Sequence, residues 1–502
     1  MSGFPFFNQG ALIGSGRDPG ATALIDLSGA APRHISYAAL DAMANAVARG
    51  LLKRGLMRGD RIGILAANSA EFLAALYGAQ RAGLVAVPVN WRFPPATVGY
   101  VLRNSGAVLV FCDAARRATV PEGVAAVEMG SAEWDALLDP GPFAPVVPEP
   151  AEPALFLYTS GSTGRPKGVV LSHQSHLWVV EQRLKGADIG RERALIAAPL
   201  YHMNGLALAQ LCCAAHVTVV LLPQFDARAY LRAIGEHRVT WITGVPPMIA
   251  MLLQERALLA ETDTSSVRHV RCGSAPTSPA LLEAIRAAFP QARFVNGYGT
   301  TEAGPVVFGP HPGGLATPPL SVGYPHPAVE LRLRAAGGSI GDEGVLEQRC
   351  PAMMNGYWNR PDITPPITPD GFYVTGDVFR RDEHGFHTVA GRVDDMFISG
   401  GENIFPSEVE KVLEMHPGVE QSAVIPLPDE IKGTKPVAFI VRSTSGAAID
   451  EAAVKAHALA HAPAFMHPRR VWFLDALPLM GTNKIDKAQL AAWARERLGG
   501  ED

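Results

Sequence analysis

The sequence predicts an α/β fold, with a large amino-terminal domain of helix-covered mixed and parallel sheets, a β-rich subdomain and a small carboxyl-terminal α+β domain. Three observations support this. Apolar strand-like runs alternate with helical patterns over roughly the first three hundred residues, as in parallel sheets covered by helices. From about Leu331 the segments are short and rich in turns, and after Arg392 helices and strands mix again. Because 502 residues exceed one typical domain, we expect domains at 1–393 and 394–502.

The first predicted elements are a helix, a strand, a second helix and a second strand. One face of the first helix carries apolar residues at helical spacing, namely Leu40, Met43, Ala44, Val47 and Leu51. RIGILAA at 61–67 is expected to be a buried strand, and Ser69 is expected to cap a helix over 71–83. VAVPV at 85–89 is the next predicted strand.

The alternation continues as far as residue 296. We expect strands at 154–158, 194–198, 217–222, 241–243, 267–272 and 293–296, and helices at 228–237 and 280–289. Residues 139–153 hold six prolines, a density at which no helix forms, so we interpret them as a surface connector between two sheet subdomains. Residues 206–222 are the most membrane-like stretch, but their polar and β-branched residues favour a buried helix that runs into a buried strand.

The last third of the chain contains two kinds of predicted structure, first β-hairpins and then mixed helices and strands. DGFYVTGD at 370–377 and EHGFHTVAGR at 383–392 are typical of β-hairpins. Beyond them we expect a Gly-Gly loop, helices at 407–415, 452–462 and 488–498, and strands at 422–426 and 437–441. These elements would form the small carboxyl-terminal domain.

Composition and charge exclude several classes of function. The net charge of −4 and the lack of large basic clusters argue against nucleic acid as a partner. The five cysteines are odd in number and form no C-x-x-C pair, which argues against a disulfide framework or a zinc site. The amino terminus lacks the features of a signal peptide. We therefore expect a cytoplasmic protein without a membrane span.

The segment YTSGSTGRPKG at 158–168 is poor in residues that pack and rich in hydroxyl groups and glycine. It could be a flexible linker, or a loop whose backbone N–H and hydroxyl groups surround an anion. It is not a standard P-loop, because Lys167 follows Pro166 instead of glycine. The loop alone leaves both interpretations open.

Four further motifs decide between them. They are NGYGTTEAG at 296–304, YVTGD at 373–377, GRVDDMFISGGENIFPSEVE at 391–410 and GTNKIDK at 481–487. In this order, and over essentially the whole chain, the five motifs resemble the adenylate-forming (AMP-binding) superfamily, in its acyl-CoA synthetase branch. The resemblance implies an acid–thiol ligase with ATP, Mg²⁺, coenzyme A and a carboxylic acid as its small-molecule partners.

The implied chemistry explains the residue types. A carboxylate attacks the α-phosphorus of ATP, so two anions meet and the protein must supply fixed positive potential. The resemblance implies that the 158–168 loop wraps the β- and γ-phosphates through Thr159, Ser160, Gly161, Ser162, Thr163, Gly164 and Lys167. Thr301 would reach the α-phosphate, and Glu302 would hold Mg²⁺.

The same resemblance implies a nucleotide site. Tyr298 would lie against adenine, Asp377 would accept from the ribose hydroxyls, and Arg392 would lie near ribose and phosphate. The loops around adenine would contain Gly273, Ser274, Ala275, Pro276, Asn296, Gly297, Gly299 and Thr300. The plainer interpretation of Tyr298 is a core aromatic residue at a strand end.

The carboxyl-terminal domain would supply the catalytic lysine, for which adjacency to Asn483 favours Lys484 over Lys487. The resemblance implies that this domain swings about Asp394 between two half-reactions. The swing would bring Gly400 and Gly401 to the thiol channel. Arg469 would meet the coenzyme A phosphates, whereas Lys432 stands where some relatives carry tryptophan, which puts that surface in doubt.

The acyl pocket is implied at His202, as a gate, and at Gly205, Leu206, Thr243, Gly297 and Val306, with Cys272 and Gly273 beside them. An isolated histidine such as His202 is also common as a core residue. These positions are small or apolar and include no charged side chain, so we expect a monocarboxylate, aryl or short to medium in length, with branching or hydroxylation allowed.

Competing functions on the same fold stay open. An amino-acid-adenylating enzyme needs an aspartate near residue 200, and PLYHMNGL at 199–206 has none. A luciferase-like oxygenase and a non-catalytic nucleotide-binding protein are two further hypotheses. Dimers are common in the family, so a homodimer is an open expectation.

Overall fold

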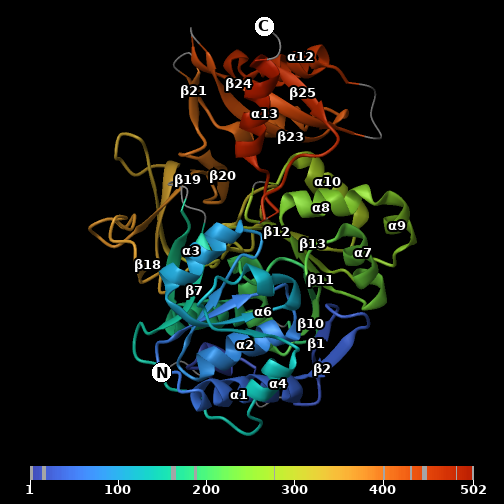
Figure 1. The fold of residues 1–502 in the computed structure, drawn as a ribbon. Helices are drawn as coiled ribbons and strands as arrows, with labels where there is room; N and C mark the ends of the chain where they lie inside the picture. Colours follow the sequence, from blue (N-terminus) through green and yellow to red (C-terminus); the bar gives the residue numbers. More distant parts are fainter. Residues whose placement is uncertain are drawn as a thin grey trace.

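The computed structural model describes residues 4–13, 18–159, 165–185, 189–275, 277–399, 402–429, 432–443, 449–481 and 483–499. A large amino-terminal body contains two seven-stranded sheets, a four-stranded sheet and a two-stranded sheet with their helices, and a smaller carboxyl-terminal lobe lies above it in Figure 1. The predicted fold class is confirmed. No helix in the described ranges is long and apolar enough to span a membrane.

The first seven-stranded sheet carries the predicted strand–helix–strand order. Its strand order is β18-β8-β7-β4-β3-β5-β6. The bounds are β3 Arg61–Leu65, β4 Val85–Pro88, β5 Ala107–Cys112, β6 Ala126–Glu128, β7 Pro153–Thr159, β8 Lys167–Ser172 and β18 Gly356–Trp358. The strands from β7 to β6 are parallel, whereas β8 and β18 each run antiparallel to their neighbour.

Helices α1 (Tyr37–Lys53), α2 (Ala70–Arg81), α3 (Pro95–Ser105), α4 (Ala132–Leu137) and α5 (His173–Leu184) accompany this sheet. Ser69 caps α2 as predicted, because its hydroxyl accepts a hydrogen bond from the Phe72 amide at 3.1 Å. Short 3₁₀ turns lie at Gln9–Ala11, Ala114–Thr119 and Ala464–Met466.

The connector at 139–153 contains no helix, as expected from its prolines, but the prediction that it joins two sheet subdomains is wrong. It leads from α4, which follows β6, to β7, and both strands belong to one sheet. The register explains the return, since Leu155 of β7 pairs with Ala86 of the central strand β4. The prolines mark a long surface path across one sheet.

The second seven-stranded sheet has the order β13-β12-β11-β9-β10-β1-β2. Its strands are β1 Thr22–Asp26, β2 Arg33–Ser36, β9 Arg193–Ile196, β10 Thr218–Leu221, β11 Trp241–Gly244, β12 His269–Gly273 and β13 Arg293–Gly297. Its helices are α6 Met203–Ala215, α7 Ala227–Glu236, α8 Pro246–Gln254, α9 Arg256–Glu261 and α10 Pro279–Ala288. Helix α6 and strand β10 confirm the buried helix and strand expected over 206–222.

The β-rich region follows as an antiparallel sheet in the order β16-β17-β19-β20. Its strands are β16 Glu330–Arg334, β17 Glu343–Arg349, β19 Tyr373–Arg381 and β20 His387–Arg392, and a short pair joins β14 Phe308–Gly309 to β15 Tyr324–Pro325. The predicted hairpin is therefore β19–β20, in which Asp377 lies opposite Arg392.

The carboxyl-terminal lobe has its own sheet and cores. It consists of β21 Phe397–Ser399, β22 Glu402–Ile404, α11 Pro406–Leu413, β23 Val419–Asp429, β24 Gly433–Arg442, α12 Glu451–His461, β25 Val471–Leu474 and α13 Lys487–Gly499. Two apolar clusters in this lobe contain only residues from position 397 onward. Helix α11 contacts the body, where the Ser407 hydroxyl donates to the Ala390 carbonyl at 2.7 Å and Lys411 donates to that of Val389 at 3.2 Å.

The contact between helices α1 and α4 in the body depends on a glycine. A β-carbon on Gly50 of α1 would lie 2.0 Å from the carbonyl oxygen of Leu137, at the end of α4. Gly50→Ala should therefore force the two helices apart, and overpacking of this kind costs about 1–3 kcal/mol or more. We expect the midpoint of thermal unfolding to fall by several degrees.

Gly337→Ala is the matched control, because a β-carbon there meets nothing within 4 Å. Equal midpoints for the two variants, measured by circular dichroism, would show that the α1–α4 contact tolerates a methyl group.

Candidate active site

Most of the predicted motifs meet where strands of both large sheets end. Strand β7 ends at Thr159, and β12 and β13 end side by side at Gly273 and Gly297, which pair in register. The hydroxyl oxygen of Thr159 is buried and has no hydrogen-bond partner among the described residues. An unpaired buried hydroxyl is expensive unless a ligand satisfies it. Ser160, Gly161, Ser162, Thr163, Gly164 and Pro276 lie outside the described residues.

Lys167, Tyr357 and Glu302 form one end of the site. Strand β18 pairs with β8 and thereby places Tyr357 near Lys167, whose ammonium lies 4.6 Å from the ring centroid. The Tyr357 hydroxyl donates to Glu302 Oε1 at 3.2 Å. Burial and the Glu302 charge raise the pKa of Tyr357, so the phenol keeps its proton and orients the carboxylate. The ammonium of Lys167 and the carboxylate of Glu302 therefore lie next to the end of the predicted phosphate loop.

Tyr298, Asp377 and Arg392 form the opposite end. The Tyr298 hydroxyl donates to Asp377 Oδ2 at 2.5 Å, and Arg392 Nη1 donates to Asp377 Oδ1 at 2.6 Å. Burial raises the pKa of Asp377, and Arg392 and Tyr298 oppose this rise. The Tyr298 ring packs edge-on against Phe379, at 4.9 Å between centroids. The ring of Tyr298 therefore packs as a core aromatic residue, as the plainer interpretation expected, and its hydroxyl also orients Asp377.

Lys484 reaches this end of the site from the carboxyl-terminal lobe. Burial lowers the pKa of its ammonium, and the nearby carboxylates of Asp377 and Asp395 oppose that effect. In Figure 1 the segment that precedes α13 descends from the lobe toward the body. By contrast, Lys487 lies 3.5 Å from Glu410 of its own lobe. This geometry favours Lys484 over Lys487 as the lysine that acts at the site.

Two contacts hold the Lys484 loop on the body. Arg92 Nη1 donates to Asn483 Oδ1 at 3.1 Å, and the Tyr201 hydroxyl donates to the Gly481 carbonyl at 3.3 Å. Asn483 has a φ of 59°, a left-handed conformation that asparagine adopts more readily than most residues. Sequence reasoning missed Arg92 and Tyr201, since nothing in their local motifs marks a partner several hundred positions away.

His202 precedes α6 and faces the same loop. Its Nε2 atom is buried without a hydrogen-bond partner among the described residues. Burial, together with the charges of Lys484 and Arg92, lowers the pKa of His202 to about 3. The imidazole is therefore neutral near pH 7.

The predicted hinge and coenzyme A residues lie on or near the lobe. Asp394 is in the turn after β20, is exposed, and lies 3.7 Å from Arg392. Gly400 and Gly401 fall outside the described residues. Arg469 Nη1 lies 3.1 Å from His467 Nε2. Burial lowers the pKa of His467, and the charges of Arg469, Lys455 and Lys432 add to this effect. Three cations therefore lie near one imidazole on the lobe.

Several predicted acyl-pocket residues serve the packing of the body. Gly205 allows α6 to approach the backbone, because a β-carbon there would lie 2.6 Å from the Ala198 carbonyl oxygen. Leu206 is fully buried in the largest core, and Val306 packs in a small cluster with Val179 and Ala352. Thr243 is also buried, and its amide donates to the Tyr230 hydroxyl at 3.1 Å.

Gly297 has a charged neighbour that its place in the sequence did not indicate. A β-carbon on this glycine would lie 2.7 Å from Nε and 2.9 Å from Nη2 of Arg271. Arg271 was not predicted at the site, because the alternation of residues along a strand does not tell which neighbouring strand its side chain will meet. The pairing of β12 with β13 brings it to Gly297.

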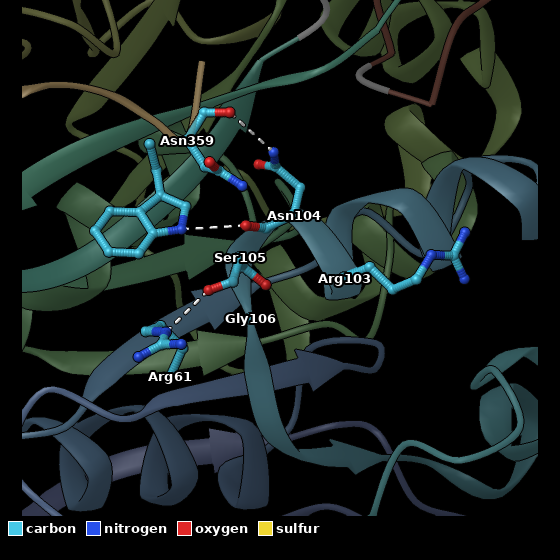
Figure 2. Close-up of a pocket in the computed structure, with 7 residues that line it drawn as sticks. Arg61, Arg103, Asn104, Ser105, Gly106 and Asn359 are labelled. Carbon is cyan, nitrogen blue, oxygen red and sulfur yellow. Dashed lines mark hydrogen bonds between the residues drawn. The ribbon is translucent and has the colours of Figure 1, made fainter. Parts of the chain in front are cut away.

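A pocket of about 400 Å³ lies at the end of α3, and none of its lining residues belongs to the candidate site (Figure 2). Its polar groups bond to one another. Trp358 Nε1 donates to the Asn104 carbonyl at 3.1 Å, and Arg61 Nε donates to that of Ser105 at 2.9 Å. These bonds satisfy carbonyl groups at the end of α3. The pocket residues therefore have a structural role in fastening this helix end to the sheet.

Comparisons with known proteins identify the family. The AMP-binding enzyme model matches residues 14–358, and its C-terminal domain model matches residues 408–484. A feruloyl-CoA synthase from Amycolatopsis sp is 36% identical, and the match covers 93% of this chain and 94% of that protein. A sulfoacetate–CoA ligase from Cupriavidus necator is 31% identical, and the match covers 91% of this chain and 92% of that protein. The crystal structure of ATP-bound MatB from Rhodopseudomonas palustris has a TM-score of 0.87 at 31% identity, covering 97% of this chain and 98% of that one. The chain belongs to the AMP-binding enzyme family and is an acid–thiol ligase.

The Tyr298–Asp377 bond gives a prediction about nucleotide binding. Tyr298→Phe keeps the ring but removes the donor to Asp377. A hydrogen bond to a charged group contributes about 1.5–3 kcal/mol, and its loss would leave the buried carboxylate more readily protonated. We expect affinity for AMP, measured by calorimetry, to fall about tenfold or more.

Tyr324→Phe is the control, because Tyr324 contributes ring packing against His311 and Phe386. An unchanged AMP affinity in Tyr298→Phe would mean that Asp377 needs no orientation by the phenol, or that it does not contact the nucleotide.

Proposed function

We propose that the protein activates a carboxylic acid with ATP to an acyl-AMP, releasing pyrophosphate, and then transfers the acyl group to coenzyme A. The observation that carries this proposal is the position of Lys484. A lysine from a separate lobe lies partly buried within electrostatic reach of Asp377 and Arg392. There its charge can neutralise the carboxylate and the α-phosphate as they react.

The phosphate end of the site supports the first step. Thr159 and Lys167 flank the loop expected to hold the β- and γ-phosphates, and Thr301 immediately precedes Glu302 in the chain. The described residues contain no cluster of three or more potential metal ligands. Mg²⁺ binds through one or two carboxylates together with substrate phosphates, so one carboxylate of the chain is enough to hold it. Glu302 would hold the ion, which when bound neutralises phosphate charge.

Rotation of the carboxyl-terminal lobe is proposed for the second step. The lobe, taken as residues 394–502, would turn about Asp394 and exchange Lys484 for the loop that contains Gly400 and Gly401. The separate cores of the lobe support rigid-body motion. Arg469 and Lys432 lie near one imidazole and would meet the phosphates of coenzyme A.

The proposed substrate has an aryl or a short to medium skeleton, with branching or hydroxylation allowed. The acids named for the relatives, ferulate and sulfoacetate, differ too much in size to choose between these options. A neutral His202 with a free nitrogen supports a role beside the acyl group. Location in the cytoplasm and assembly as a homodimer are also proposals.

Amines, carrier proteins and, for a luciferase-like enzyme, oxygen are competing acceptors on this fold. A non-catalytic nucleotide-binding protein would have no need of a lysine delivered from a second lobe. No contact among the described residues favours one of these functions over transfer to coenzyme A.

Activity measurements separate these functions. We expect ATP–pyrophosphate exchange that depends on a carboxylic acid, and acyl-CoA formation once coenzyme A is added. Exchange without acyl-CoA formation would indicate another acceptor. Absence of exchange with every acid in a panel of aryl, short and medium-chain acids would contradict the proposed activity.

Lys484→Ala should slow acyl-AMP formation by about a hundred- to thousandfold, the cost of losing one preorganised charge-stabilising group. Acyl-AMP is measured directly by rapid quenching. Thioester formation from supplied acyl-AMP should be nearly unchanged. Lys487→Ala is the control and should keep both rates. Acyl-AMP formation at the original rate in Lys484→Ala would disprove the assigned role.

A further inference from the structure

Two arginines beside the site have no partner in the part of the chain that the structure describes. Arg183 lies on α5 and Arg271 on β12, and neither makes an ion pair or hydrogen bond through its side chain with the described residues. The Nη1 atom of Arg183 is buried. In contrast, the buried Arg81 bonds to Asp41 at 2.6 Å, to Asn45 at 2.5 Å and to the Gly10 carbonyl at 2.6 Å. Within the described residues, the guanidinium of Arg81 is therefore fully paired, whereas those of Arg183 and Arg271, which are partly buried, are not.

The position of Arg271 connects this charge to the site. Its guanidinium lies against Gly297, which immediately precedes Tyr298. Gly297 also pairs with Gly273 at the ends of β13 and β12. A side chain larger than hydrogen at 297 would displace the guanidinium. The arginine is therefore held at the edge of the nucleotide site, where the acyl group of the substrate is expected.

Arg183 adds a second positive charge to the same region. Burial and the charge of Arg271 lower the pKa of Arg183 to about 9, and Cys212 of α6 is the third group that influences it. No carboxylate of the described residues contributes to the electrostatics of either arginine. Charges that are partly removed from water without a counterion are destabilising, so the region is suited to an anion supplied by a ligand.

We propose that Arg183 and Arg271 bind a second anionic group of the substrate, a carboxylate or sulfonate distant from the carboxylate that is adenylated. This inference rests on the proposed function and replaces the expected monocarboxylate with a dianionic acid. Arginine suits the role because its planar fork binds such groups through two parallel hydrogen bonds. Lys167 and Lys484 remain available for the phosphates and the reacting carboxylate.

The test compares acids that differ only in the second charge. Pentanoate is paired with glutarate, benzoate with phthalate, and propanoate with 3-sulfopropanoate, and kcat/KM is measured by ATP–pyrophosphate exchange. We expect the wild-type protein to prefer at least one dianionic member by about tenfold or more. Arg271→Gln and Arg183→Gln should each reduce activity with that acid by about 10- to 100-fold, and should leave its monoanionic counterpart and the KM for ATP nearly unchanged.

Arg271→Lys keeps the charge without the fork and should retain part of the preference. Arg293→Gln is the matched control, because Arg293 is exposed on the neighbouring strand β13. This variant should retain the full preference for the dianionic acid. A wild-type preference for monoanionic acids that Arg271→Gln does not alter would overturn the proposal. An equal loss with all acids, together with a raised KM for ATP, would also overturn it by assigning the arginine to the nucleotide.

A binding measurement separates failure of this inference from failure of the proposed function. Lys484→Ala should still be stabilised against heat by the preferred dianion, and the double variant with Arg271→Gln should not. Stabilisation without exchange in the wild-type protein would support the anion site and count against the ligase activity. Equal stabilisation of both variants by the dianion would overturn the anion site.

Discussion

Partial burial of the Lys484 ammonium beside Asp377 and Arg392 is the constraint on which the rest of the site depends. A charge in this place has strong effects because little water screens it, but burying it is costly. Asp377 and Asp395 reduce that cost. Because the lysine belongs to a different lobe from Asp377, its burial exists only while lobe and body are in contact. Charge stabilisation and domain arrangement are thereby coupled.

The contacts at the junction agree with that coupling. They include a few polar bonds, such as Tyr201 to Gly481 and Arg92 to Asn483, while the apolar clusters of the lobe stay within the lobe. Bonds of this type contribute about 1 kcal/mol each in water. A junction built from them holds the lysine in place and can also release it. The two arginines proposed to bind an anion lie on elements of the body, α5 and β12, so the proposed rotation of the lobe would leave their positions unchanged.

Most elements of the fold could be predicted from the sequence, because burial of one face gives the apolar residues of a helix or strand a regular spacing. Helix α2 with its Ser69 cap and the strands on either side are examples. The short strand β18 could not be predicted, because its three residues pair with β8, which lies far earlier in the chain. Lys484 was predicted from its motif. Arg92 and Arg271 were not, because their roles depend on partners such as Asn483 and Gly297 that only the fold brings near.

Helix α13 begins a few residues after Lys484, and its Leu490 and Ala494 are fully buried in the lobe core. This packing anchors the end of the segment that carries the lysine. Alterations far from the nucleotide, such as bulky peptide extensions that loosen α13, would therefore misalign the ammonium without touching the ATP pocket. In crystallisation or activity work, affinity tags are for that reason better attached at the amino terminus.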